Sequence, residues 1–392
     1  MQTPDPIPRS RRELLVAGAS LAGLGMTELV GGSACAQERA ARAGDGEPLG
    51  ADPADLLDAG LARLHAGYPS TNVHRSNHVP MVIEALGVLG RADDIAPWLD
   101  GNLDHYRPDT DAKGRVEAER WREFLGRPEL FPDWRELFLV ELRGDDWRTV
   151  VRRWVPRLVP GLAGAATHGV IRTAHAVRSL GARDSEVRRT ELATGLAYWA
   201  VNHEELPWDG TLAPAKSVAD AIARVQPRLP ARQPPQGNIV SGLRALADTP
   251  SFRPVAGFVD VADPVRTLGE MSSAFARLYL RNPDRRIAFT HSITAPSALR
   301  LLAPHLDEET VLAATRFAWQ AAAGIYVVYG DPRLGEPGER APASREALVA
   351  ACVANGGAHS IKLTEACLRE EALSHDPILF AAARDAGESM NG

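Results

Sequence analysis

The chain has 392 residues, of which 45% are hydrophobic and 24% are charged. This composition is typical of a globular protein with a sizeable core and argues against intrinsic disorder. The formal net charge of −6 and the lack of any long run of Lys or Arg give no electrostatic footprint for nucleic acid or for an anionic membrane surface. We therefore expect a small-molecule ligand and no nucleic-acid partner.

Residues 1–36 are predicted to be an export signal and not part of the fold. Arg11 and Arg12 precede a short apolar run rich in Ala, Gly and Leu, and the tripeptide Ala-Cys-Ala at 34–36 has the small residues of a cleavage site. This pattern resembles a twin-arginine signal, whose substrates are exported already folded, often with a metal or cofactor bound. We therefore expect residues 37–392 to reach the periplasm or the medium through the twin-arginine export machinery.

No stable membrane insertion is expected. A transmembrane helix needs about 20 consecutive apolar residues. The apolar run of the signal is too short for that length, and no later segment is expected to qualify.

Helical spacing of apolar residues continues along almost the whole mature chain, and strand-like alternation is nearly absent. The helical segments are ADLLDAGLARLHAGY, MVIEALGVLG, WRELFLVELR, WRTVVRRWVPRLVPGLAGAA, LATGLAYWAVNH, VRTLGEMSSAFARLYL, ITAPSALRLLAPHL and VLAATRFAWQAAAGIYVVY. The sequence therefore predicts an all-α fold, a single compact multi-helix domain. Two stretches rich in Pro and Gly, 205–254 and 330–344, are expected to be long loops.

Several familiar catalytic motifs are missing from the sequence. It contains no H-E-x-x-H, no C-x-x-C and no G-x-S-x-G, which removes the main support for a zinc peptidase or a serine hydrolase. Outside the signal only Cys352 and Cys367 remain, too few for a disulfide framework or a thiolate metal site. We expect these two cysteines to be buried and free, with a disulfide between them as the alternative.

Four of the 11 histidines lie in apolar surroundings of small residues. They are His78, His168, His291 and His359. A single histidine of this kind is more often a hydrogen-bonded core residue, but four imidazoles directed inward from four helices would form a metal site in the core of a bundle. Imidazole binds iron, zinc, copper and nickel alike, so the ligand type alone does not select the metal.

A second feature is the helical stripe that His168 begins. His175 follows seven residues later, which is two helical turns, and Arg178 lies one turn beyond. The three side chains are therefore expected on nearly the same face of one helix.

The blocks NHVPM…ALGVLG, HGVI, HSITAPSALR and HSIKLTEAC, in this order and at these separations, resemble the questin oxidase family. Members of that family include fungal enzymes that oxidatively open anthraquinone-type rings and bacterial proteins of unknown role. The resemblance extends from about Leu56 to Cys367. It implies a mononuclear non-haem iron, Fe(II), held by four histidines and a carboxylated lysine. On this chain those ligands are His78, His168, His291, His359 and Lys362.

One departure from the family pattern concerns the block after His168. The family reads roughly His-Pro-Leu-Ile-His-Leu-Gly-Tyr there, whereas this chain has Arg172 in place of the second histidine and His175 where an aromatic residue is usual. We therefore place His175 and Arg178 in the catalytic or substrate-binding set and His168 on the metal. For Lys362 the alternative is a surface ammonium paired with Glu365.

The predicted function is that of an exported iron-dependent oxygenase, which uses O2 to open a ring of a planar aromatic or polyketide-like substrate by cleaving a C–C bond. A metal-dependent hydrolase that uses histidines and a carboxylated lysine is one alternative, although its usual form needs H-x-H and an eight-stranded α/β barrel. A non-catalytic exported helical protein that binds a ligand is the other. Convergence of the four histidines and Lys362 within about 5 Å of one point would favour the iron enzyme, because such a set can reach one ion at metal–nitrogen bonds of about 2 Å.

Overall fold

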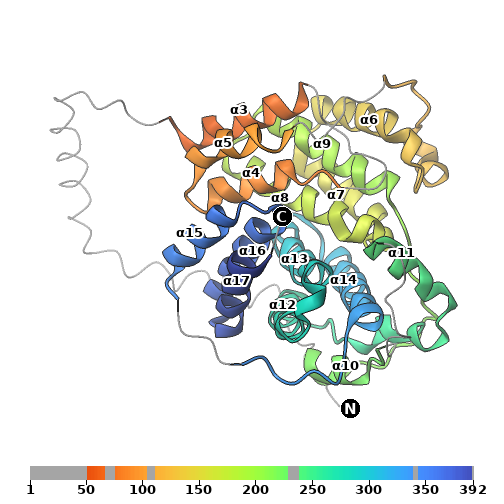
Figure 1. Cartoon of the computed structure of the whole chain (residues 1–392). Coiled ribbons are helices and arrows are strands. Elements are labelled where there is room, and N and C mark those ends of the chain that lie inside the picture. The colour runs from red at the N-terminus through yellow and green to blue at the C-terminus, as the bar shows by residue number, and fades with distance from the viewer. Residues whose placement is uncertain (1–50, 67–75, 104–110, 228–237, 339–342, 391–392) are drawn as a thin grey trace, which may run out of the picture. The chain divides into compact units, whose positions relative to one another are not determined.

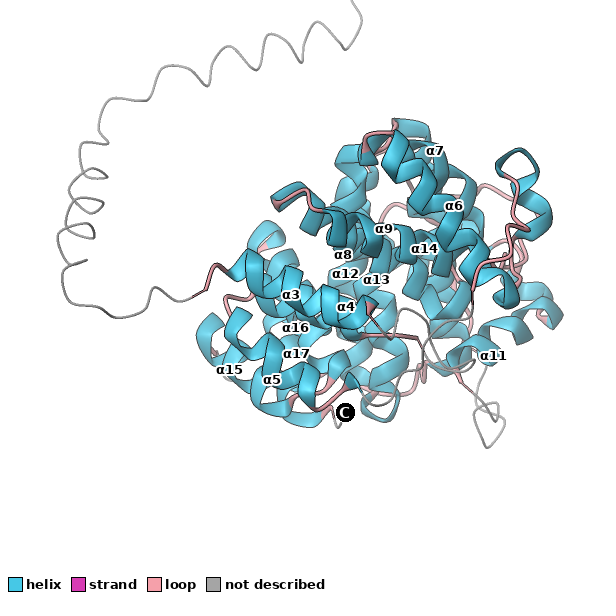
Figure 2. Ribbon diagram, turned by 90° about the horizontal axis from the view of Figure 1, so that it is seen from above, coloured by secondary structure: helices cyan, strands magenta, loops and turns pink. Residues whose placement is uncertain are grey.

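The computed structural model describes residues 51–66, 76–103, 111–227, 238–338 and 343–390. Within these ranges all regular secondary structure is helical (Figure 2), which confirms the predicted fold class. The residues from Asp52 onward form one unit by their contacts. The expected export signal, residues 1–36, lies outside the described part of the chain.

The α-helices follow one another along the chain, and several of the connections between them contain short 3₁₀ segments (Figure 1). Their bounds are α3 Pro53–His65, α4 Val79–Val88, α5 Ile95–Asp100, α6 Phe131–Gly144, α7 Trp147–Leu158, α8 His168–Ala182, α9 Glu186–Val201, α10 Val218–Arg224, α11 Ile239–Arg244, α12 Pro264–Arg281, α13 Arg286–Leu302, α14 Glu308–Tyr329, α15 Arg345–Asn355, α16 Ala358–Ser374 and α17 Pro377–Ser389.

Most helices outside the central group begin with a side-chain cap, and α5 and α6 are exceptions. Peripheral helices such as α3, α7, α9, α12, α14 and α17 begin at an Asp or Ser whose side chain accepts a hydrogen bond from the first turn. Helices α4, α8, α13 and α16 begin without a side-chain cap. These four are the helices on which the sequence places the candidate metal ligands.

The four uncapped helices pack in a closed cycle: α4 contacts α8, α8 contacts α13, α13 contacts α16, and α16 contacts α4. Outer helices cover them, with α9 on α8, α12 and α14 on α13, and α17 on α16 (Figure 1). Each of the four is therefore buried on several sides. Helix α4 is apolar almost all round, whereas α8 and α16 carry charged residues inside the fold that must find partners there.

Helix α14 differs from one sequence expectation. By length and composition alone it could cross a membrane, contrary to the prediction that no later segment would qualify. In the structure 72% of its most apolar window is buried inside the fold, and Trp319 donates its indole N–H to the carbonyl of Val255 at 2.7 Å. Its apolar residues therefore serve the core packing.

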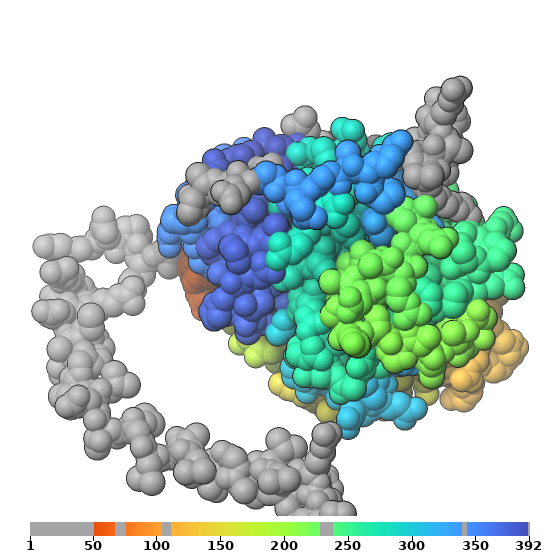
Figure 3. Space-filling model, turned by 90° about the horizontal axis from the view of Figure 1, so that it is seen from below, coloured from red at the N-terminus to blue at the C-terminus, as the bar shows by residue number. Residues whose placement is uncertain are grey.

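The expected long loop 205–254 is more structured than predicted. It contains the short helices α10 and α11 and further 3₁₀ turns, and α10 packs on α12. Figure 3 shows the first part of this segment on the molecular surface beside α12. The Pro and Gly residues of this segment indicate where the chain is irregular. They do not predict the short helices, which form because they cover apolar surface of α12 and α14. The described part of the second loop, 330–338, has no helix.

A buried network of ion pairs connects the four central helices. Glu84 of α4 accepts hydrogen bonds from Arg178 of α8, at 2.7 Å from Nε and 2.5 Å from Nη2. Arg178 also donates to Glu365 of α16, which in turn accepts from Arg369 at 3.0 Å. Breaking such a buried pair leaves an uncompensated charge in the interior.

The network continues to α13 through Glu370 of α16, a residue with no exposed surface. Its carboxylate accepts from Ser297 Oγ and from Arg300 Nη1, both at 2.7 Å, and from Arg369 Nη1 at 3.1 Å. All four central helices are thus joined by charged hydrogen bonds in addition to apolar packing.

We predict that Glu365→Gln lowers the free energy of unfolding by about 3 kcal/mol, because it removes a buried negative charge that pairs with the partly buried Arg178 and Arg369. Glu270→Gln is the matched control, since Glu270 pairs with Arg266 on the exposed face of α12. Urea denaturation of both variants and the wild type measures the difference. Equal losses of unfolding free energy for the two variants would show that the buried Glu365 pairs stabilise the fold no more than the exposed Glu270 pair does.

Candidate metal centre

Three of the four candidate histidines occupy helix starts. His78 directly precedes α4, His168 is the first residue of α8, and His359 is the second residue of α16. His291 lies in the second turn of α13. Because the four helices pack in a cycle, these positions bring the four side chains to the same region.

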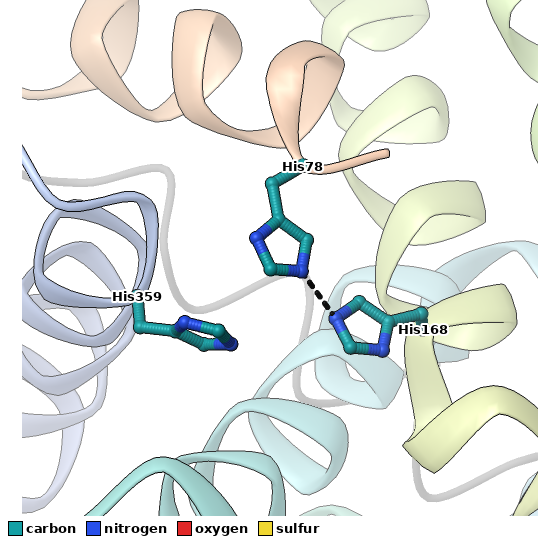
Figure 4. Close-up of side chains that lie close together, drawn as sticks. All are labelled: His78, His168 and His359. Atoms are coloured by element: carbon teal, nitrogen blue, oxygen red, sulfur yellow. Dashed lines mark hydrogen bonds between the residues drawn. The ribbon is translucent and has the colours of Figure 1, made fainter. Parts of the chain in front are cut away.

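The imidazole rings form a closed ring of contacts. Centroid distances are 4.8 Å for His78–His168, 4.5 Å for His168–His291, 5.4 Å for His291–His359 and 4.6 Å for His78–His359. Nε2 of His78 and Nε2 of His168 are 2.8 Å apart, and Figure 4 shows these two rings and that of His359 directed toward one another. We call the four residues the histidine cluster.

Nitrogen atoms of His78, His168 and His359 all lie within 4.8 Å of one another. The nitrogens of His291 lie outside this group, although its ring contacts two of the others. Nδ1 of His291 and Nε2 of His359 are buried without a hydrogen-bond partner among the described residues. Such orphaned atoms are costly in a protein interior and leave nitrogens free to bind a cation.

Lys362 lies one turn after His359 on α16 and is 3% exposed. Burial lowers the pKa of its ammonium group to about 7. Its charge in turn lowers the pKa of all four histidines, which places it beside the cluster. The alternative of a surface ammonium paired with Glu365 is wrong, because Lys362 is buried and the Glu365 carboxylate is bound by Arg178 and Arg369.

The cluster histidines are neutral at physiological pH. Burial is the main cause that lowers the pKa of each imidazole, followed by the charge of Lys362 or of a neighbouring histidine. For His291 the pKa falls to about 3. The positive ends of the helix dipoles of α4, α8 and α16 act in the same direction. Neutral imidazole is the form that binds metal ions.

The backbone before His168 adopts an unusual conformation. Ala165, Ala166 and Thr167 have φ angles of 47°, 54° and 68°, which is left-handed helical space. This conformation costs roughly 1–2 kcal/mol per residue for an L-amino acid with a Cβ atom. It directs the carbonyl of Ala165 at Nδ1 of His168, 2.6 Å away. A carbonyl only accepts, so Nδ1 of His168 carries the proton and Nε2 presents a lone pair.

His175 and Arg178 lie outside the histidine cluster. His175 donates from Nδ1 to Glu84 at 2.6 Å, and Arg178 binds the same carboxylate, so both side chains belong to the buried ion network. The arginine and the histidine together hold the pKa of Glu84 below its usual value despite its burial. A small cavity adjoins this group, lined by Leu61, Pro80, Glu84, Arg172, His175, Ala176, Ser179 and Glu191.

The structure adds acidic partners that the sequence analysis missed. Glu84 holds His175 and Arg178, and Glu191 binds Arg172 through two hydrogen bonds of 2.5 and 2.9 Å. Glu191 also contacts His65 at 2.9 Å. The available signal was a lone carboxylate inside an otherwise apolar helix, as in MVIEALGVLG, which implies a buried and paired charge.

The two remaining cysteines, Cys352 and Cys367, are both buried and free, as predicted. Burial raises the pKa of Cys352 to about 11. Neither thiol belongs to the candidate metal-binding group of His78, His168 and His359.

The metal-free protein should lose stability as the pH falls below about 6.5. Unfolded histidine takes up a proton near that pH, whereas buried His291 stays neutral down to about pH 3. At pH 5 this difference removes ~2 kcal/mol through His291 alone. The depressed carboxylate pKa of Glu84 acts in a lower window, below about pH 4.5.

Urea denaturation of chelator-treated protein at pH 7.5, 6 and 5 measures this dependence. His291→Gln cannot titrate and should show a shallower slope than the wild type. A wild-type unfolding free energy that stays constant from pH 7.5 to 5 would contradict the neutral, buried state of the cluster.

Comparison with known proteins provides a family. The model of the questin oxidase-like family matches residues 75–367, a range that includes the histidine cluster and Lys362. No curated protein matches the chain. Because the match covers most of the sequence, this chain belongs to the questin oxidase-like family.

Proposed function

We propose that the chain is an exported oxygenase that holds Fe(II) in the histidine cluster and uses O2 to open a ring of a planar aromatic substrate. Family membership supports an oxidoreductase of the oxygenase type. The observation that carries the rest is the set of four neutral imidazoles in mutual contact, of which His168 and His291 are buried and His78 and His359 are half-buried. Nδ1 of His291 and Nε2 of His359 have no partner among the described residues. We further propose export to the periplasm or the medium, on the basis of Arg11 and Arg12.

The donor set fits a divalent metal ion. Two nitrogens bound side by side at about 2.1 Å from one ion lie roughly 3 Å apart in octahedral geometry. The Nε2 atoms of His78 and His168, at 2.8 Å, are close to that separation. Imidazole by itself does not distinguish iron from zinc. The choice of Fe(II) rests on the resemblance to the family.

Lys362 completes the proposed set as a carbamate. A protonated lysine would repel a metal ion, whereas its carbamate offers an anionic oxygen ligand. Carbamate formation needs the neutral amine, which burial makes more accessible here than in a free lysine. The cluster contains no carboxylate among its described neighbours, so a carbamate would supply the missing negative charge.

When bound, Fe(II) would supply the activation of O2. The remaining tasks fall to side chains of the chain itself. The packed helices shield His168 and His291 from bulk water, and the Ala165 carbonyl keeps the His168 Nε2 lone pair directed inward. His175, oriented through Nδ1 by Glu84, faces the small cavity and can hold or move a proton there. Arg178 positions the Glu84 carboxylate.

The uncapped starts of α4, α8 and α16 favour a substrate with an anionic oxygen. Their helix dipoles place positive potential around the cluster, although the first N–H group of α4, that of Val79, is already bound by Asn77 Oδ1. A phenolate or enolate oxygen of a planar polyketide-like compound has the matching charge. We therefore propose hydroxylated planar aromatics as the substrate class.

The structure argues against both alternatives, the metal-dependent hydrolase and the non-catalytic ligand-binding protein. A hydrolase of the barrel type needs eight parallel strands, and the described residues contain none. A ligand-binding protein without catalysis gives no reason for four imidazoles to converge at the cost of unpartnered buried nitrogens.

Each single replacement of a cluster histidine with Ala, at His78, His168, His291 or His359, should lower Fe(II) affinity more than 100-fold. Loss of a metal ligand should cost more than the 10- to 100-fold effect of losing a residue that only hydrogen-bonds to a ligand. His305→Ala is the matched control, since His305 packs on Trp147 outside the cluster. His175→Ala should keep the iron and lower O2 uptake with hydroxylated anthraquinones. Anaerobic metal analysis and an oxygen electrode provide the measurements. Full iron content in His291→Ala, or loss of iron in His175→Ala, would refute the assignment.

For Lys362 we expect the order wild type, then Lys362→Glu with partial iron, then Lys362→Arg with almost none. Glu supplies a shorter carboxylate in a similar direction, whereas Arg keeps the positive charge and cannot form the lysine carbamate. Bicarbonate during anaerobic loading should raise iron occupancy in the wild type and not in the Glu variant. A carbamate signal in the ¹³C NMR spectrum after ¹³C-bicarbonate treatment is the direct readout. Wild-type iron content in Lys362→Arg would exclude the carbamate.

A further inference from the structure

Three consecutive left-handed residues without a glycine are rare, and Ala165, Ala166 and Thr167 form such a turn directly before a cluster histidine. All three are buried, so they are not an adjustable surface loop. Left-handed conformations at residues with a Cβ persist only where the surrounding structure imposes them, and they concentrate at functional sites.

Close contacts hold the chain on both sides of the turn. A Cβ atom on Gly164 would lie 1.6 Å from the carbonyl oxygen of Asn202, and one on Gly169 would lie 2.7 Å from the side chain of Trp199. The backbone therefore touches Asn202, the residue after α9, before the turn, and the last turn of α9 after it. Thr167 adds a hydrogen bond from Oγ1 to the Ala166 carbonyl at 2.5 Å.

The turn has one structural result that bears on the cluster. It presents the Ala165 carbonyl to Nδ1 of His168, three residues later in the chain. A right-handed helix would direct this carbonyl along the helix axis toward a backbone N–H. Of the four cluster histidines, His168 is the one whose ring is hydrogen-bonded to a described backbone carbonyl, while Nδ1 of His291 and Nε2 of His359 have no partner among the described residues.

We propose that the turn Ala165–Thr167 is a strained positioning element that fixes the tautomer and ring orientation of His168 for metal binding. This inference rests on the proposed metal site. The contacts of Gly164 with Asn202 and of Gly169 with Trp199 hold the three residues in the left-handed conformation. The Ala165 carbonyl holds the proton on Nδ1. The Nε2 lone pair therefore points into the cluster, where it accepts a hydrogen bond from Nε2 of His78 that a bound ion would replace. An outer partner of this kind usually sets both the direction and the basicity of a histidine ligand.

The test separates strain from simple stability by using two variants with opposite effects on the fold. Ala165→Gly/Ala166→Gly relieves the strain, because glycine adopts positive φ readily, and it loosens the carbonyl. Gly164→Ala forces the chain away from Asn202 and displaces the turn at a cost in stability. Ala193→Gly, in the right-handed interior of α9, is the control for an alanine-to-glycine change in a buried helix.

Three measurements are made on each protein. They are the Tm of the metal-free form, the imidazole ¹⁵N chemical shifts of histidine-labelled metal-free protein, and the anaerobic Kd for Fe(II) by calorimetry. The double glycine variant should keep or raise the Tm, show a mixture of His168 tautomers and bind Fe(II) 10- to 100-fold more weakly. Gly164→Ala should lower both Tm and affinity. Ala193→Gly should lower only the Tm.

An unchanged His168 tautomer in the double glycine variant, or a clearly lowered Tm, would overturn the positioning role. So would Fe(II) affinity equal to that of the wild type. If the wild type itself binds no Fe(II), the proposed function fails, and the tautomer and the Tm of the metal-free proteins still decide the role of the turn.

Discussion

The ion pairs of Arg178 with Glu84 and Glu365 are the constraint on which the site depends, because they join α8 to α4 and to α16 in the interior. His78, His168 and His359 lie at the starts of these three helices. Buried ion pairs add little net stability compared with apolar packing, but a misaligned one is costly. These ion pairs therefore fix the positions of the helices along their axes. A shift of any one helix would leave a buried charge without its partner and would separate the histidines.

The interior contains two groups of ionisable side chains, the ion network and the histidine cluster, and they differ in how their charges are balanced. The ion network, from Glu84 to Glu370, balances each buried carboxylate with arginine. The histidine cluster, by contrast, has a buried lysine and no carboxylate, and its imidazoles are kept neutral by burial. A divalent ion bound there would add two positive charges with no carboxylate among the described neighbours to balance them, which is the physical reason to connect Lys362 with a carbamate in the proposed site.

Strain and electrostatics act on the same residue. His168 follows a left-handed turn that costs roughly 1–2 kcal/mol per residue, and it stands at a helix start whose dipole disfavours protonation. Both effects work toward one neutral tautomer with Nε2 directed at His78.

The sequence alone determined the helical class, because apolar spacing is a local property, and it selected His78, His168, His291 and His359 by their apolar surroundings. Only the tertiary structure decided that Lys362 is buried and that His175 and Arg178 bind Glu84, which is 91 residues from His175. It also decided the helices within 205–254 and the turn at Ala165, where no Gly or Asn marks positive φ. Burial, pairing and strain depend on what packs against a residue, and that partner comes from another part of the chain.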